Sequence, residues 1–220
     1  MMEQVAAAPE PQPDAAEVAS AEEIETLRGR FGEAMAVLKQ ADTKRQLGGT
    51  YVYQLPWYPI IGPPGCGKTT ALVNSGLRFS LAEHLGQDPI RGVGGTRSCD
   101  WWFSDEAMLL DTAGRYTTQD SHEAVDSAAW LGFLALLKKH RPRRPINGVL
   151  VAVSLADLTQ QTDTERALQA SAVKQRVQEL HQHLGVRFPI YVLFMKGDLI
   201  AGFMEVFGDL GKEDREQVCA

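Results

Sequence analysis

The segment GPPGCGKTT at 62–70 constrains the fold of this 220-residue chain more than any other stretch. Its first eight residues match G-x-x-x-x-G-K-[ST] in full, after the apolar run WYPII at 57–61 and before a helical pattern at about 67–75. A glycine-rich turn between a strand and a helix points backbone N–H groups at one spot, beside the positive end of the helix. The segment therefore predicts a strand, a phosphate-binding loop and a helix, in that order.

Each part of this loop has an expected task. Glycines without a Cβ let the backbone approach a phosphate. Lys68 is expected to reach the β- and γ-phosphates of a nucleoside triphosphate, and the Thr69 hydroxyl is expected to ligate Mg²⁺. Because Pro63 and Pro64 have no N–H, the donors must come mainly from Gly65 onward. The predicted loop contacts to the nucleotide are Gly62, Gly65, Cys66, Gly67, Lys68, Thr69 and Thr70.

Two segments further along predict the rest of a metal and γ-phosphate site. In LLDTAGR (109–115), Asp111 ends an apolar run and is expected to hold Mg²⁺ through water. Gly114 is expected to offer its N–H to the γ-phosphate, so that the following loop senses that phosphate. In GVGGTRSCDWW (92–102), Thr96 is the candidate threonine that completes the Mg²⁺ shell, after a long, glycine-containing loop at 77–95.

The segment FMKGDL at 194–199 is the candidate base-reading element. Lys196 and Asp198 have the spacing of [NT]-K-x-D, in which the carboxylate accepts hydrogen bonds from guanine and the lysine stem stacks along the base. Met195 stands where that motif has Asn or Thr, and its side chain cannot make the polar contact. The choice between GTP and ATP therefore stays open.

Arg115 stands directly after the D-x-x-G segment, where small GTPases commonly have a water-orienting Gln. A guanidinium cannot accept a proton, so slow hydrolysis is expected. Two roles stay open for Arg115: stabilising phosphate charge within the same chain, or forming a surface ion pair. The candidate catalytic set is Lys68, Thr96, Gly114 and Arg115.

Apolar runs alternate with helical patterns along most of the chain. The runs lie at 57–61, 107–110, 148–154 and 189–195, and the later two read as strands buried on both faces of a parallel sheet. Helices are expected at about 123–141 and 162–184, and CDWWFSDEAMLL (99–110) suggests an antiparallel hairpin. The expected fold class is α/β: a three-layer P-loop NTPase domain, similar to a small GTPase, with a mostly parallel sheet.

The predicted organisation has three parts. Residues 1–20 are rich in Ala, Pro and Glu and are expected to be disordered. A helix is expected within 21–48, because apolar residues recur there at three- and four-residue steps: Ile24, Leu27, Phe31, Met35 and Leu38. Residues 49–220 form the predicted NTPase domain.

Composition excludes several classes of protein. A net charge of −6 does not favour broad nucleic-acid binding. No window reaches the ~18 apolar residues of a membrane span, and the N-terminus does not read as a signal peptide. The three cysteines form no zinc or disulfide pattern, which suits a reducing cytosol. The basic run KKHRPRRP (138–145) is either a solvated helix end or a contact for anionic lipid.

The motifs together resemble the cytoplasmic nucleotide-binding region of the IcmF/TssM family of type VI secretion. The resemblance covers about 55–203, and its most specific runs are CDWWF, DTAGRYTTQD and RPRRPINGVL. It implies a GTPase-like domain on the cytoplasmic face of the bacterial inner membrane, cut here as a soluble piece from a longer membrane protein. It also implies partners: a DotU/TssL-like membrane protein, baseplate components and, through an absent periplasmic region, a TssJ-like lipoprotein.

Two hypotheses of function follow. The first is a slow NTP hydrolase that binds Mg²⁺ with GTP or ATP and whose turnover serves assembly of the secretion apparatus. The second is a structural component of a membrane complex, with a switch-like or vestigial nucleotide pocket. Intact Lys68, Thr69, Asp111 and Gly114 favour a working pocket, whereas Arg115 favours slow chemistry.

Overall fold

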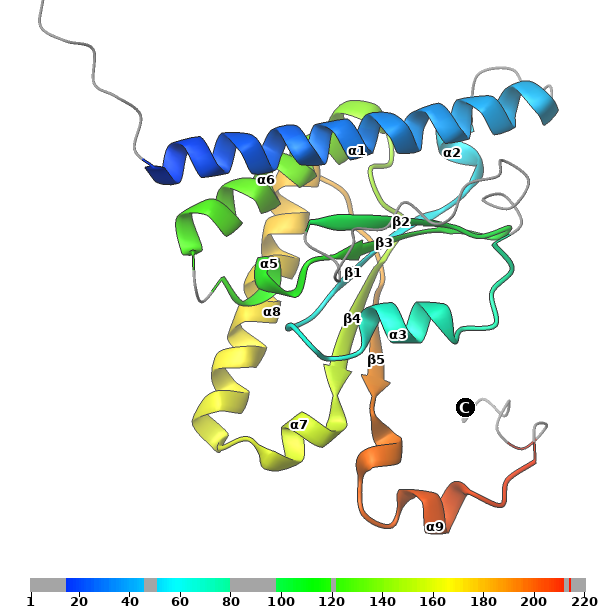
Figure 1. Cartoon of the computed structure of the whole chain (residues 1–220), viewed down its shortest axis with the longest axis vertical. Helices are drawn as coiled ribbons and strands as arrows, with labels where there is room; N and C mark the ends of the chain where they lie inside the picture. Colours follow the sequence, from blue (N-terminus) through cyan, green and yellow to red (C-terminus); the bar gives the residue numbers. More distant parts are fainter. Residues whose placement is uncertain (1–14, 46–50, 80–97, 120–121, 212–213, 215–220) are drawn as a thin grey trace, which may run out of the picture.

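The computed structural model describes residues 15–45, 51–79, 98–119, 122–211 and 214. Its centre is a five-stranded sheet in the order β2-β3-β1-β4-β5 (Figure 1). β2 runs antiparallel to β3, and the other neighbours are parallel. The predicted α/β class, the mostly parallel sheet and the hairpin are confirmed. The strands are β1 (Trp57–Ile61), β2 (Cys99–Phe103), β3 (Met108–Thr112), β4 (Val149–Ser154) and β5 (Ile190–Met195).

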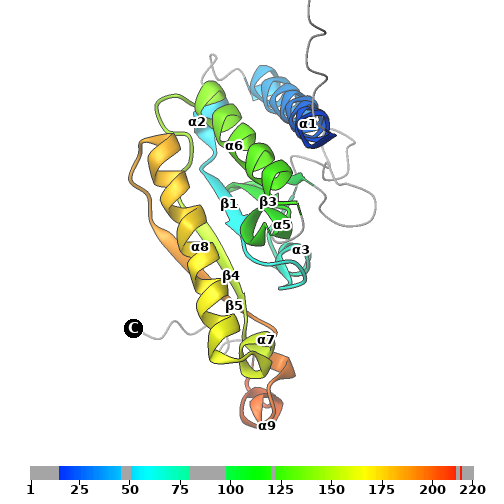
Figure 2. The same cartoon turned by 90° about the vertical axis from the view of Figure 1, so that its left-hand side faces the viewer.

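Helices cover both faces of the sheet (Figures 1 and 2). The two longest helices of the sheet region begin and end within about one residue of the predicted positions. Thr162 explains one of these starts, because its side chain and that of Glu165 form a reciprocal capping box. The helices are α1 (Ala15–Arg45), α2 (Tyr51–Gln54), α3 (Lys68–Val73), α5 (Gly114–Thr118), α6 (Glu123–His140), α7 (Leu155–Gln160), α8 (Asp163–Leu184), the 3₁₀ turn η1 (Gly197–Leu199) and α9 (Phe203–Phe207).

The N-terminal helix begins before the apolar residues whose spacing predicted it. α1 begins at Ala15, so the prediction of disorder is wrong for residues 15–20, while residues 1–14 lie outside the described part. The stretch after Pro13 is rich in Ala and Glu, which favour helix without needing an apolar face. The predicted apolar face is confirmed by burial of Leu27, Phe31, Met35 and Leu38.

Two hydrophobic clusters lie on opposite faces of the sheet. The larger joins α1, α6 and α8 to the sheet, and Phe31 packs edge-on against Trp101 with ring centroids 4.7 Å apart. The smaller lies under α3 and contains Trp102. The adjacent Trp101 and Trp102 therefore face opposite ways, as neighbouring residues of a strand do, and both are buried.

One residue of the basic run is part of the fold. The Arg141 guanidinium is buried 4.5 Å from the centre of the Trp57 ring, and burial lowers its pKa to about 10. Arg143 and Arg144 are exposed, and Lys138 Nζ donates to the His183 carbonyl at 2.9 Å. The run 138–145 thus combines a packed arginine with exposed charges.

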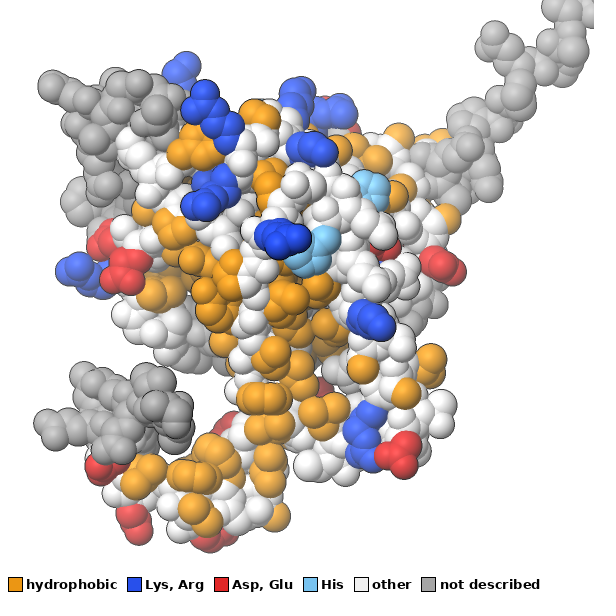
Figure 3. Space-filling model, turned by 180° about the vertical axis from the view of Figure 1, so that it is seen from behind, with side chains coloured by type: hydrophobic (Ala, Val, Ile, Leu, Met, Phe, Trp, Pro, Cys, Tyr) orange, Lys and Arg blue, Asp and Glu red, His pale blue; other side chains and the backbone are white. Residues whose placement is uncertain are grey.

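β5 differs from its prediction as a strand buried on both faces. It pairs with β4 along one edge only, and most of its side chains are exposed. The sequence pattern records apolar side chains but not their neighbours, and the described elements leave the outer side of β5 uncovered. Figure 3 shows hydrophobic side chains gathered along β5 and over α9 on this face. The exposed apolar residues there include Ile190, Tyr191, Val192, Phe194, Met204, Val206 and Phe207.

We expect two opposed valines to respond differently to the same change. Val151 on β4 is paired with Val192 on β5, but they are 4% and 51% exposed. Val151→Thr should lower the free energy of unfolding by about 2 kcal/mol, because it buries a hydroxyl. Val192→Thr should change it by less than about 0.5 kcal/mol, because its hydroxyl meets water. Urea denaturation of both variants checks this, and equal losses would contradict the exposed placement of β5.

Candidate functional site

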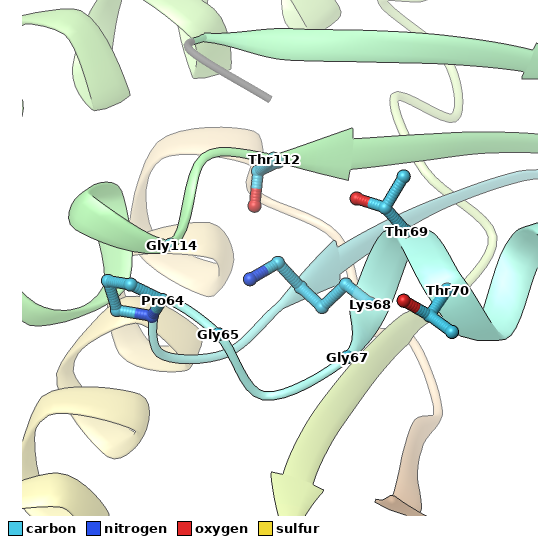
Figure 4. Close-up of a pocket in the computed structure, with 8 residues that line it drawn as sticks. All are labelled: Pro64, Gly65, Gly67, Lys68, Thr69, Thr70, Thr112 and Gly114. Carbon is cyan, nitrogen blue, oxygen red and sulfur yellow. The ribbon is translucent and has the colours of Figure 1, made fainter. Parts of the chain in front are cut away.

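The candidate site lies where the parallel strands end. β1, β3, β4 and β5 run the same way, so the segments that follow them meet at one edge of the sheet. A cavity of about 310 Å³ opens there, between the glycine-rich loop after β1 and the turn after β3. Figure 4 shows its lining, which is Pro64, Gly65, Gly67, Lys68, Thr69, Thr70, Thr112 and Gly114.

The loop after β1 is shaped by glycine. Gly67 immediately precedes α3 with a φ of 101°, a conformation that side chains with a Cβ rarely adopt. This geometry brings the start of α3 round to face the cavity. Within this loop the Cys66 N–H donates to the Pro63 carbonyl at 3.5 Å.

Lys68 lies across its own loop. Its Nζ donates to the carbonyl oxygens of Gly62 at 2.8 Å and Pro63 at 3.2 Å, and the side chain is 7% exposed. Figure 4 shows it extending across the space between α3 and the Pro64–Gly65 turn. A buried ammonium held by two neutral carbonyls has no full counter-charge in these contacts, which suits it to an anion entering the cavity.

Thr69 lines the cavity and is bonded to Asp111, which is not part of the lining. The Thr69 hydroxyl donates to Asp111 Oδ2 at 2.5 Å, and Asp111 is completely buried. Asp100 lies opposite Asp111 across the β2–β3 ladder and is also buried, with Arg30 of α1 donating to its carboxylate at 3.1 Å. A hydroxyl and a carboxylate oxygen side by side are the donor types that Mg²⁺ prefers.

Gly114 closes the other wall. A Cβ at this position would lie 2.4 Å from the backbone nitrogen of Pro64, so only glycine allows the two loops this close. Two threonines hold the junction. Thr112 Oγ1 donates to the Ile60 carbonyl at 2.6 Å, and Thr117 Oγ1 accepts from the Gly62 N–H at 3.0 Å. The turn after β3 and the glycine-rich loop therefore form one packed unit.

Arg115 does not line this cavity. Its guanidinium pairs with Glu23 of α1 at 2.6 Å and with the buried Asp126 of α6. The neighbouring Tyr116 hydroxyl donates to the same Glu23 oxygen at 2.5 Å. Burial, and then this hydrogen bond, raise the pKa of the Tyr116 hydroxyl far above its ordinary range. Of the two predicted roles, the structure shows the ion pair, and it is partly buried.

Sequence reasoning did not find Glu23, Arg30 or Asp126. Glu23 and Arg30 lie seven residues apart on α1, hence on one helix face, but only the fold shows what that face meets. Asp126 lies in the first turn of α6, where acidic residues are common at helix starts and do not indicate burial. These residues lack a motif of their own because their partners are distant in the chain.

The base-reading segment lies beside the glycine-rich loop but not in the cavity lining. A Cβ on Gly67 would lie 3.8 Å from the Met195 Cβ, so the end of β5 adjoins the loop. Lys196 has a φ of 56° and its Nζ pairs with Asp157 at 3.5 Å. Asp198 is exposed in η1. The switch candidate Thr96 lies outside the described residues.

Cys66 faces the core rather than the cavity. It is fully buried among Ile60, Leu72 and Trp102, and burial raises the pKa of its thiol. Its backbone amide belongs to the loop, but its side chain fills space under α3. Modification of this thiol is therefore not an easy way into the site.

Comparison with known proteins identifies the family. The IcmF-related N-terminal domain matches residues 123–220. The type VI secretion system component TssM1 of Pseudomonas aeruginosa is 63% identical over 209 residues, which are 94% of this chain. The chain belongs to the IcmF/TssM family. It spans 19% of the length of that IcmF/TssM relative.

One solved structure is weakly similar to this IcmF/TssM chain. It is a crystal structure of an ADP-ribosylation-factor-like GTP-binding protein, the small COPII coat GTPase SAR1 of Encephalitozoon cuniculi, in complex with GDP. The sequences are 14% identical over 90% of this chain and 86% of the other, with a TM-score of 0.26.

Among the residues that the structure describes, no helix is long and apolar enough to cross a membrane.

We expect Cys66 of this IcmF/TssM chain to resist alkylation. With iodoacetamide under native conditions, its modification should be about tenfold or more slower than in urea, because the thiol is buried and less ionised. Mass spectrometry of the peptide containing Cys66 measures the rate, with the unfolded chain as control. Equal rates in the two conditions would contradict the placement of this side chain.

Proposed function

We propose that this chain is a GTPase-like nucleotide-binding domain that holds a nucleoside triphosphate with Mg²⁺. One observation carries the proposal. Lys68, Thr69 and Gly114 line a single cavity at the carboxyl edge of a parallel sheet, and Thr69 is bonded to the buried Asp111, which lies outside that lining. Phosphate, metal and γ-phosphate contacts of a P-loop NTPase need these groups in this arrangement.

Mg²⁺ fits the oxygen donors at this wall. Thr69 Oγ1 and Asp111 Oδ2 are hard ligands, and the ion would supply charge neutralisation for the phosphate oxygens. The 2.5 Å hydrogen bond places the two oxygens side by side, so Thr69 would ligate the ion directly and Asp111 would hold it through water. Asp111 is fixed by the β1–β3 pairing, because Asp111 lies opposite Ile60 one residue before β1 ends.

The chain's own groups would change partners when nucleotide binds. Lys68 would exchange the carbonyls of Gly62 and Pro63 for phosphate oxygens, which carry full negative charge. Gly114 would offer its N–H from the opposite wall of the cavity. Hydrolysis is expected to be slow because Arg115 is committed to Glu23 and Asp126 and no Gln follows Gly114.

The second candidate function is a structural switch in which turnover is incidental. The same ion pairs favour it, because Arg115 serves to hold α5 against two helices rather than to face the cavity. In this function nucleotide binding changes the surface that the domain presents to its partners, and the rate of cleavage does not matter.

For the whole protein we propose a role in type VI secretion. The support is the identity to a curated type VI secretion system component and the shared IcmF-related domain. We further propose that the domain works on the cytoplasmic face of the inner membrane, as part of a membrane complex. Its proposed partners are a DotU/TssL-like membrane protein and baseplate components, with a TssJ-like lipoprotein bound by another part of the full-length protein.

Calorimetry with non-hydrolysable analogues tests nucleotide binding and base choice. We expect the GTP analogue to bind about tenfold more tightly than the ATP analogue, because hydrogen bonds to a charged carboxylate contribute ~1.5–3 kcal/mol. Asp198→Ala should remove that difference, and EDTA should weaken both. Equal or tighter binding of the ATP analogue by the unaltered chain would refute the role of Asp198.

Turnover separates the two functions. With Mg²⁺ and the preferred nucleotide, we expect hydrolysis on the order of 10⁻³ per second, as in GTPases without an activating partner. Lys68→Ala should abolish binding and turnover, whereas Lys174→Ala, an exposed lysine on α8, should change neither. A rate equal to that of Lys68→Ala, measured by phosphate release, would exclude the enzyme and leave the switch.

A further inference from the structure

We propose that Glu23 of α1 is a positioning residue for the Gly114 turn, and that it couples α1 to the nucleotide state of the site. This inference rests on the proposed nucleotide binding and concerns its regulation. Figure 1 shows α1 running alongside α6 and past the β2 edge of the sheet. None of the motifs that predicted the candidate site includes a residue of α1.

Glu23 joins α1 to α5, and Arg115 extends the contact to α6. A single oxygen, Oε1, accepts from Arg115 Nη2 at 2.6 Å and from the Tyr116 hydroxyl at 2.5 Å. Arg115 also reaches the buried Asp126 on α6. The side chains of Glu23 and Arg115 are 21% and 32% exposed, so water screens this pair less than a surface pair.

The link is one residue away from the candidate γ-phosphate contact. Arg115 and Tyr116 follow Gly114 directly in α5, and Gly114 packs on the backbone of Pro64. Gly114 and Arg115 are consecutive residues of the same five-residue helix, so a shift of the Arg115 backbone also moves Gly114. Holding Arg115 therefore holds Gly114 at the cavity wall, ready for a γ-phosphate.

A second contact of α1 reaches the metal wall. Arg30 Nη1 donates to Asp100 Oδ1 at 3.1 Å and to the Cys99 carbonyl at 3.3 Å. Asp100 is the cross-strand neighbour of Asp111, which accepts from Thr69. One face of α1 therefore contacts both parts of the site. Arg30 contacts β2, which lies beside Asp111, and Glu23 contacts Arg115, which follows Gly114.

The Glu23 link can open without undocking the helix. The apolar anchors of α1 that are fully buried start at Leu27 and continue through Phe31 and Ala34. Glu23 lies one turn before them, and Val18 is already 43% exposed. The link is therefore a local contact near one end of a helix that other residues dock, and by linkage a γ-phosphate that favours the turn as seen here also favours the link.

The test compares Glu23→Gln with the matched control Glu25→Gln. Glu25 is on the same helix, is 68% exposed and pairs with Arg28 one turn away. For Glu23→Gln we expect the affinity for a non-hydrolysable triphosphate analogue to fall about fivefold or more, a typical allosteric coupling, with diphosphate affinity changed less than about twofold. Glu25→Gln should change neither. Tyr116→Phe, which removes only the hydroxyl contact to Glu23, should lower the affinity for the triphosphate analogue by a smaller factor.

Amide hydrogen exchange supplies a readout that does not need nucleotide. Glu23→Gln should speed exchange at 114–118 and leave α8 unchanged, and in the unaltered chain the triphosphate analogue should slow exchange at 20–26. If Glu23→Gln lowers the affinities for triphosphate and diphosphate equally, or lowers neither, the positioning role is wrong. If the unaltered chain binds no nucleotide, both the proposed function and the coupling fail. Faster exchange at 114–118 in Glu23→Gln would then still show that Glu23 holds the Gly114 turn, whereas unchanged exchange would show that it does not.

Discussion

The contact of Gly114 with Pro64 is the constraint on which the candidate site depends. It requires a residue without a Cβ after β3 and a loop after β1 that bends back toward it. The parallel pairing of β1 with β3 brings these two loops to the same edge of the sheet, and Thr112 and Thr117 bond across the junction. Loss of this approach would separate the Lys68 side of the cavity from the turn proposed to sense the γ-phosphate.

The polar network around Arg115 extends this constraint to the outer helices. A guanidinium shared by two carboxylates fixes α5 relative to α1 and α6, which themselves pack through large apolar side chains. Hydrophobic burial sets the position of the helices, and the charged contacts set the position of a short turn between them. A domain built this way can change the turn without disturbing the core, which is what a switch needs.

Several features were predictable because they depend on short-range patterns. The glycine-rich loop, the strand before it and the hairpin at 99–110 follow from local spacing, and the Trp101–Trp102 alternation follows from the two-residue period of a strand. The start of α1 at Ala15 was missed because Ala and Glu form helix without an apolar signal. The exposure of β5 was missed because a run of apolar residues does not say which neighbours cover it.

The sequence by itself determined the order of the strands and of the long helices along the chain, the α/β class and the family, since these depend on local spacing and on runs of identical residues. Only the tertiary structure decided where Arg115 goes, because Glu23 is 92 residues away and no local rule joins them. It also decided that the Cys66 side chain faces the core and that Asp100 stands opposite Asp111. Contacts between residues so far apart in the chain depend on how the helices pack over the sheet, and packing is a property of the whole fold.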